Sequence, residues 1–268
     1  RLAAELGQDT RFVPVDVLNR NSIALFTAEL ARTGFSIDHL ISLAGGSLEG
    51  EYKGLQVLTT KLPRTVGDVF VSNVAGTTFA TRLSGVVGAH CDCDVHFART
   101  ERRGWGVTNG YTQPRLMGVD RWVAMVGAWS EVQAACLVVD VGTAVTIDTI
   151  DDEGGHLGGQ IVPGVATMAN SLSSATSDIP QVRPAPGRGA ADIGMFARNT
   201  AAAVREGAQN AVVGAVDRAI QTLQANAYEP VVVLTGGDAS RILNALCESP
   251  LHRPHLVLRG LAHMLETA

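Results

Sequence analysis

Hydrophobic positions along the chain follow two periods, and these predict strands and helices in alternation. Short apolar or alternating runs predict strands at 11–18, 38–46, 66–76 and 94–100. Apolar residues at helical spacing predict helices at 21–34, at 77–90 and from about Gly118 onward. The first strand, helix and strand form a β-α-β unit, which predicts a parallel strand pair. A polar, irregular stretch at 49–64 is expected to be a linker.

The second half of the chain predicts a different arrangement around one central hairpin. Residues 136–151 read as a hairpin and 156–164 as a further strand, which together predict an antiparallel meander. Helices are expected at 165–177 and 199–224, with a Pro- and Gly-rich loop between them at 181–192. Residues 230–246 predict a buried strand, a Gly-Gly turn and a helix. The alternation of elements favours the α/β class.

Composition and charge narrow the classes of function. The 268 residues are 46% hydrophobic and 18% charged, which is typical of a folded globular protein. The formal net charge of -5 gives no electrostatic basis for binding nucleic acid or an anionic membrane. No stretch is long and apolar enough to span a bilayer, and the N-terminus lacks the apolar core of a signal peptide. We therefore expect no nucleic-acid or membrane partner.

The four cysteines, Cys91, Cys93, Cys136 and Cys247, form no recognisable framework. The stretch "HCDCDVH" at 90–96 lacks C-x-x-C spacing and a second cysteine pair, so it indicates a surface turn before a strand more than a zinc site. Cysteines without a pairing framework predict free thiols in the reducing cytoplasm.

The central stretch "VVDVGTAVTID" at 138–148 carries the first candidate chemistry. Gly142 permits a backbone conformation with positive φ, and Thr143 adds a hydroxyl beside its own N–H, so the turn offers several donors to a phosphate oxygen. Asp140 offers a hard oxygen ligand to a cation beside the phosphates. The pattern also fits an ordinary hairpin with a tight glycine turn. Thr146 and Asp148 on the returning strand face either the same cleft or the core.

Three further motifs suit a small-molecule site. Gly236 and Gly237 separate a buried strand from an expected helix N-terminus, where a nucleotide can approach the backbone closely. Asp120 and Arg121 begin a helix, where the carboxylate suits a general base and the guanidinium suits a carboxylate ligand. Tyr111 follows a turn and is suited to lining a pocket. The alternatives are a plain strand-to-helix turn, a helix-capping Asp with a surface Arg, and a partly buried structural Tyr.

The order of these motifs resembles that of type III pantothenate kinases. The resemblance runs from about Val66 to the C-terminus and is carried by "NGYTQPRLMGVDRWVAMVGAW", "VVDVGTAVTIDTID", "HLGGQIVPGVATM", "RNTAAAVREG", "VVLTGGDA" and "LVLRGL". It implies two ribonuclease-H-like domains of the acetate kinase, sugar kinase, Hsp70 and actin type. It also implies ATP-dependent phosphorylation of pantothenate, the first step toward coenzyme A, by a homodimer that uses potassium or ammonium, and magnesium with ATP.

The resemblance also assigns roles to residues. Asp120 is similar to the family's acceptor of the proton of the pantothenate hydroxyl, and Asp140 to its monovalent-cation ligand. The resemblance implies further contacts with pantothenate at Tyr111, Gly118, Val119, Arg121 and Thr200, and with ATP at Gly142, Thr143, Gly236 and Gly237.

The N-terminal part departs from the family pattern. The family opens with a D-x-G-N-[ST] phosphate hairpin, and no such motif precedes Asp140. Residues 1–60 instead resemble an internal piece of a short-chain dehydrogenase, without that family's glycine-rich loop or its Y-x-x-x-K pair. We therefore expect an atypical β-α-β segment at 1–60, the rest of the N-terminal kinase-like domain with the substrate loop at 61–135, and a C-terminal ribonuclease-H-like domain at 136–268.

The missing hairpin leaves alternatives for function. Loss of one preorganised set of phosphate donors predicts a kinase slowed by roughly 10²-fold or more. A second hypothesis is a binding or regulatory protein without catalysis on the same scaffold. A third, an NAD(P)-dependent oxidoreductase, rests on residues 1–60 alone.

Overall fold

The computed structural model describes residues 39–43, 68–91, 94–179 and 196–266. The strand predicted at 11–18, the helix at 21–34, the linker at 49–64 and the loop at 181–192 lie outside these residues. The chain divides into two compact units. Unit 1 comprises 1–105, 111–127 and 257–268, and unit 2 comprises 106–110 and 128–256. The domain boundaries expected from the sequence stay a prediction.

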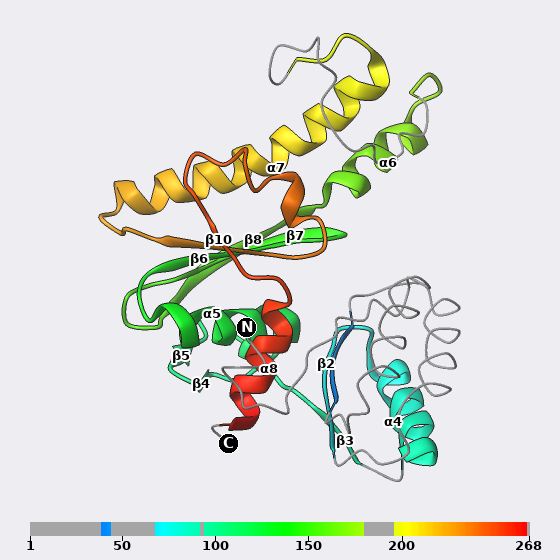
Figure 1. The fold of residues 1–268 in the computed structure, drawn as a ribbon, viewed down its shortest axis with the longest axis vertical. Coiled ribbons are helices and arrows are strands. Elements are labelled where there is room, and N and C mark those ends of the chain that lie inside the picture. The colour runs from blue at the N-terminus through cyan, green and yellow to red at the C-terminus, as the bar shows by residue number, and fades with distance from the viewer. Residues whose placement is uncertain (1–38, 44–67, 92–93, 180–195, 267–268) are drawn as a thin grey trace, which may run out of the picture. The chain divides into compact units, whose positions relative to one another are not determined.

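Unit 1 contains a three-stranded parallel sheet in the order β1 (His39–Leu43), β2 (Asp68–Asn73), β3 (Asp94–Phe97). Helix α4 (Thr77–Cys91) connects β2 to β3 and lies beside them in Figure 1. Its Phe79, Leu83 and Val87 recur every four residues and are buried, so they form the one apolar face that the helical spacing predicts. The strands predicted at 66–76 and 94–100 and the helix at 77–90 are confirmed.

Two helices contribute to both units. Helix α5 (Val119–Val132) begins in unit 1, and α8 (Leu256–Glu266) lies almost entirely in unit 1. A side chain at Gly260 of α8 would overlap the carbonyl oxygen of Val123 in α5, so this glycine permits the close approach of the two helices. Short elements precede α5: β4 (Arg103–Gly104), β5 (Val107–Thr108) and the 3₁₀ turn η1 (Pro114–Leu116).

Unit 2 is built on a five-stranded mixed sheet in the order β10-β9-β6-β7-β8. The strands β6 (Cys136–Val141), β7 (Ala144–Ile150) and β8 (His156–Pro163) pair antiparallel, which confirms the predicted meander. The strands β9 (Val231–Thr235) and β10 (Leu251–His252) continue the sheet in parallel with β6. The burial of β6 on both faces explains its nearly continuous apolar run.

Helix α7 (Thr200–Ala225) covers one face of this sheet (Figure 1). Its Val212, Val216 and Ile220 share one buried cluster with residues of β6, β7 and β9. Helix α6 (Val165–Ala175) joins α7 through the contact of Ala169 with Val204. Both helices agree with the sequence prediction. None of the helices within the described ranges is long and apolar enough to cross a membrane.

The helix predicted after Gly237 is wrong. The structure has a 3₁₀ turn, η2 (Ala239–Arg241), followed by further turns up to β10. The backbone N–H groups of Arg241 and Ile242 donate to the carbonyls three residues earlier, which is the 3₁₀ pattern. Ala239 and Ile242 are buried in the core of unit 2, so their spacing reflects turns packed on the sheet and imitates a helical period.

Candidate functional site

The turn between β6 and β7 is held by backbone groups and by the start of α6. The Gly142 N–H donates to the carbonyl of Ala144 at 3.0 Å. The carbonyl of Thr143 accepts from the Gly164 N–H at 2.8 Å and from the Thr167 hydroxyl at 2.7 Å. The Thr143 side chain itself is exposed. This turn, residues 141–144, is called the hairpin turn below.

The glycine that the hairpin turn needs is not the one expected. Gly142 does not have a positive φ, and a side chain there would meet only the Ala144 carbonyl at an ordinary 3.6 Å, so the expected backbone role is wrong. A side chain at Gly164 would instead overlap the carbonyl oxygen of Gly142. The close approach of α6 therefore depends on Gly164.

Asp140 lies at the end of β6, opposite Thr146 of β7 and Thr235 of β9. The next residue along β9, Gly236, has φ +100°. A Cβ atom at Gly236 would lie 2.5 Å from Oδ1 of Asp140, and it would overlap the carbonyl oxygen of Val141. Gly236 therefore leaves the space that the Asp140 carboxylate occupies.

The oxygen ligands at this position suit a hard cation, though not a tightly coordinated one. Asp140 brings a carboxylate to the turn, and carboxylate and carbonyl oxygens are the ligands that such cations prefer. No cluster of three or more His, Cys, Asp or Glu side chains that could hold a metal occurs within the described residues. A single carboxylate fits a weakly held cation that phosphate oxygens also coordinate.

Gly237 differs from its neighbour. No atom lies within 4 Å of the position that its Cβ would take. The Asp238 N–H donates to the carbonyl of Val141 at 2.9 Å, which ties this Gly-Gly turn to the end of β6. The turn therefore lies against β6 at Gly236 and leaves open space at Gly237.

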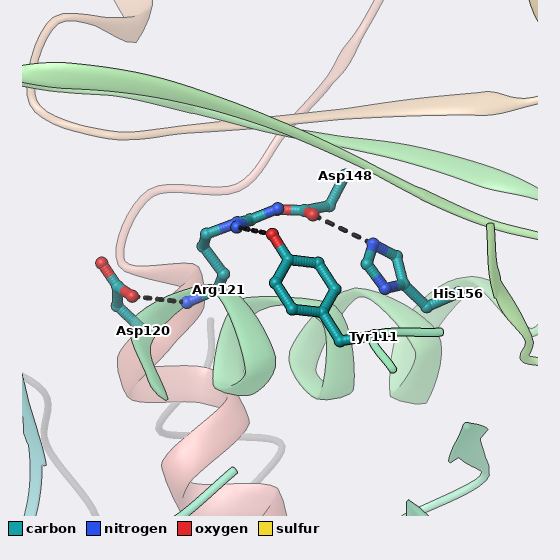
Figure 2. Close-up of polar contacts among 5 residues, drawn as sticks. All are labelled: Tyr111, Asp120, Arg121, Asp148 and His156. Atoms are coloured by element: carbon teal, nitrogen blue, oxygen red, sulfur yellow. Dashed lines mark hydrogen bonds and ion pairs between the residues drawn. The ribbon is translucent and has the colours of Figure 1, made fainter. Parts of the chain in front are cut away.

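The second group of predicted residues surrounds Arg121, at the start of α5. Its side chain is buried, and its Nη1 donates to the hydroxyl of Tyr111 at 2.8 Å (Figure 2). The guanidinium carbon lies 5.5 Å from the centroid of the Tyr111 ring, within the range of a cation–π interaction. The interpretation of Arg121 as a surface residue is therefore wrong.

Asp120 stands beside Arg121 in the first turn of α5, where a negative side chain is stabilising. Its Oδ1 accepts from the Arg121 N–H at 2.8 Å (Figure 2). A Cβ atom at Gly118 would lie 2.6 Å from the same Oδ1, so Gly118 leaves room for the carboxylate. Residues 111–118 connect Tyr111 to this helix start. We call them the substrate loop, after the role that the sequence predicts for them.

The structure thus brings most of the predicted site residues into two groups, and Thr200 belongs to neither. One group, in unit 1, comprises Tyr111, Gly118, Val119, Asp120 and Arg121. The other, in unit 2, comprises Asp140, Gly142, Thr143, Gly236 and Gly237. Thr200, also in unit 2, is the exposed first residue of α7, after the capping residue Asn199, whose side chain accepts from the Ala202 N–H at 2.9 Å.

A buried polar pair was not recognised from the sequence. Nε2 of His156, in β8, lies 3.1 Å from Oδ1 of Asp148, in β7, and both side chains are almost fully buried (Figure 2). A Cβ at Gly110 would overlap the carbonyl oxygen of His156, so the chain before Tyr111 packs on this pair. Asp148 therefore lies in the core. The signal in the sequence that could have revealed this pair is the presence of polar residues at inward-facing positions of two neighbouring strands.

The described thiols do not form a reactive site. Burial raises the pKa of Cys136, at the start of β6, to about 12. The pKa of Cys247 is also raised, mainly because its side chain is hydrogen-bonded to Asp217. Both thiols are therefore neutral at neutral pH, which disfavours nucleophilic chemistry. Cys91 ends α4 and Asp94 begins β3, and the turn expected between them lies outside the described residues.

Comparison with known proteins gives consistent matches. A family model described as type III pantothenate kinase matches residues 28–222. The type III pantothenate kinase of Nitrosococcus oceani is 34% identical over 79% of this chain and 81% of its own length. That of Nitrosomonas eutropha is 36% identical over 81% and 83%, and that of Azoarcus sp. is 37% identical over 82% and 81%. The family match begins at residue 28, so it covers part of residues 1–60, where a likeness to a short-chain dehydrogenase was expected from the sequence.

Proposed function

The chain belongs to the type III pantothenate kinase family, and on that basis we propose that it transfers the γ-phosphoryl group of ATP to the hydroxyl group of pantothenate. The product is 4′-phosphopantothenate, and the reaction is the first step of coenzyme A biosynthesis. Asp120, Arg121 and Tyr111 together carry this proposal. In this group the carboxylate of Asp120 accepts from the backbone N–H of Arg121, and the buried guanidinium of Arg121 donates to the phenol of Tyr111.

Each member of this group has a chemical role in the transfer. Asp120 accepts the proton of the attacking hydroxyl. Gly118 leaves room for its Oδ1, and the N–H of Arg121 holds that oxygen in place. Arg121 pairs with the carboxylate of pantothenate, for which its planar guanidinium is suited. Tyr111 orients Arg121 through its hydroxyl and contacts the substrate with its ring. Gly118, Val119 and the exposed Thr200 contribute further contacts with pantothenate.

The hairpin turn and the Gly-Gly turn take the nucleotide. Thr143 and the N–H groups around Gly142 donate to phosphate oxygens, while Gly237 lets the nucleotide approach the backbone. Phosphoryl transfer relies on positioning and on groups that spread the charge of the γ-phosphoryl, and the rigid attachment of the turn to α6 supplies such positioning.

Cations complete this charge balance. Asp140 would hold a monovalent cation, potassium or ammonium, beside the phosphates, because it offers a single carboxylate and not a cluster of acidic ligands. Magnesium would enter with ATP. These cations neutralise phosphate charge when bound, while the protein residues orient the hydroxyl and accept its proton.

The remaining expectations come from family resemblance. They are two ribonuclease-H-like domains and a homodimer. The N-terminal domain is proposed to depart from the usual form because its phosphate motif is missing, and a cytoplasmic location is proposed from the free thiols. The α/β class and the meander with its parallel neighbour β9 agree with such a C-terminal domain.

A second candidate function is binding of pantothenate or nucleotide without turnover. The sequence favours it in one respect, because Asp140 begins the only D-x-G-[NT] motif in the 268 residues. A kinase that held phosphates with the hairpin turn alone would be slowed by roughly 10²-fold or more.

Pantothenate-dependent formation of ADP, measured with ATP, magnesium and potassium, separates these functions. We expect turnover that requires pantothenate, and we expect Asp120→Asn to reduce it by about 10²- to 10⁴-fold without weakening pantothenate binding. Asp152→Asn, which removes an exposed carboxylate in the β7–β8 turn, is the matched control and should behave like the parent.

Each other outcome is informative. A parent protein that binds pantothenate but forms no ADP would support the non-catalytic alternative. Full activity in Asp120→Asn would remove Asp120 as the base. Binding of neither pantothenate nor ATP by the folded chain would reject both functions.

A further inference from the structure

One short segment of chain holds both ends of the substrate loop. The hydroxyl of Thr100 donates to the carbonyl of Met117 at 3.0 Å. The guanidinium of Arg102 donates to the carbonyl of Tyr111 at 2.9 Å and to that of Thr112 at 3.0 Å. These carbonyls lie at the beginning and the end of the loop, so the segment that carries Thr100 and Arg102 is hydrogen-bonded to both ends.

This segment is attached to the parallel sheet of unit 1. It follows β3 directly, and the N–H of Ala98 donates to the carbonyl of Val71, in β2, at 2.9 Å. Ala98 and Val71 are both buried. Thr100 and Arg102 therefore act from a fixed base, only a few residues beyond the sheet.

The chemistry of Arg102 suits the position. Its two terminal nitrogens donate to two consecutive carbonyls, which uses the planar fork of a guanidinium and which a lysine ammonium cannot reproduce in the same geometry. The side chain is exposed, so these bonds contribute little to global stability. Their effect is expected to be local to the loop.

Packing fixes the loop at Met117, whose side chain is buried, but leaves most residues before it exposed. A cavity of about 580 Å³ opens beside it, lined by Thr100, Thr112, Gln113, Pro114 and Arg115. The hydrogen bonds of the 3₁₀ turn, from Leu116 and Met117 to Gln113 and Pro114, order the loop from within but do not tie it to the rest of the unit. The polar contacts at its two ends supply that attachment.

We infer that Thr100 and Arg102 are positioning residues for pantothenate: they hold the backbone of the substrate loop so that Tyr111 meets both Arg121 and the substrate. Tyr111 is then fixed at two points, at its carbonyl by Arg102 and at its hydroxyl by Arg121. This inference rests on the proposed function, since it assigns a role toward pantothenate.

The test replaces Arg102 and follows the two substrates separately. Arg102→Gln should raise KM for pantothenate by about tenfold, while KM for ATP and kcat stay within about twofold and the melting temperature is unchanged. Arg102→Lys should give a smaller rise, because it keeps the charge and one donor. Arg99→Gln removes an exposed arginine on the same segment and should match the parent.

Hydrogen exchange gives a second readout that does not need activity. The amides of Leu116 and Met117 should exchange faster in Arg102→Gln than in the parent, and Arg99→Gln should leave them unchanged. If the parent shows no pantothenate turnover, the proposed kinase function fails, while exchange and calorimetric titration of pantothenate still decide the inference. Unchanged exchange, or equal changes in KM for both substrates, would overturn the positioning role.

Discussion

The hairpin turn and the substrate loop present candidate chemistry in physically different ways. The hairpin turn is held mostly by backbone groups: the β6–β7 ladder, the bond from Gly164 to Thr143, and glycines that allow close approach. The substrate loop is held by the side chains of Thr100, Arg102 and Arg121. Substitutions that add side-chain atoms should therefore disrupt the hairpin turn, and substitutions that remove side-chain atoms should disrupt the substrate loop.

The largest effect is expected from adding one methyl group behind the hairpin turn. Gly236→Ala would place a Cβ at φ +100° and against the Val141 carbonyl and the Asp140 carboxylate. Strain and overlap together should lower the free energy of unfolding by about 2–4 kcal/mol and weaken ATP binding. Urea unfolding and nucleotide titration measure both.

Gly237→Ala is the matched control for stability. It adds the same group at the adjacent residue, where no atom lies within 4 Å, so it should change the free energy of unfolding by less than about 1 kcal/mol. Equal losses in the two variants would mean that the backbone approach at Gly236 is not what shapes this turn.

A smaller effect is expected from trimming the substrate loop. Arg121→Lys keeps the charge but removes the planar guanidinium, whose Nη1 donates to the Tyr111 hydroxyl and whose carbon lies 5.5 Å from the centroid of its ring. We expect KM for pantothenate to rise by about 10- to 100-fold, with KM for ATP nearly unchanged. Steady-state kinetics with each substrate varied in turn would show this division, and a parallel rise in both constants would contradict it.

Combining that change with Tyr111→Phe tests the pair directly. Phe keeps the ring and lacks the hydroxyl, so the two single changes should be non-additive by about 1 kcal/mol. Additive effects would show that Arg121 and Tyr111 act independently.

The smallest effect concerns Thr167, whose side chain supports the hairpin turn. Thr167→Val removes one of the two donors to the Thr143 carbonyl and leaves the Gly164 N–H in place. KM for ATP should rise only severalfold, with a loss of about 0.5–1 kcal/mol in stability. Thr176→Val removes an equivalent hydroxyl-to-carbonyl bond at the other end of α6 and should leave KM for ATP unchanged. A large effect of Thr167→Val would weaken the contrast between the two regions.

The local patterns predicted most of the elements that position these regions. Helices α4 and α7 follow from a period of 3.6, since each buries one face against its own unit, and β6 follows from a nearly continuous apolar run. The prediction of a helix after Gly237 is wrong, because Ala239 and Ile242 are buried on a 3₁₀ turn and the residue after it, and their spacing imitates a helical period. The spacing of apolar residues indicates which residues are buried, and it indicates the pattern of backbone hydrogen bonds only indirectly.

What the sequence determined by itself is the family, the order of the motifs and the residue types at the candidate site. Asp120, Asp140 and Thr143 could be predicted because the ordered set of motifs around them resembles that of the family. Only the tertiary structure decided that Arg121 is buried against Tyr111, that Asp148 pairs with His156 in the core, and that Gly164 and Gly236 shape the hairpin turn. These contacts join residues of different elements, and close approach of two backbones leaves no periodic signal in either segment.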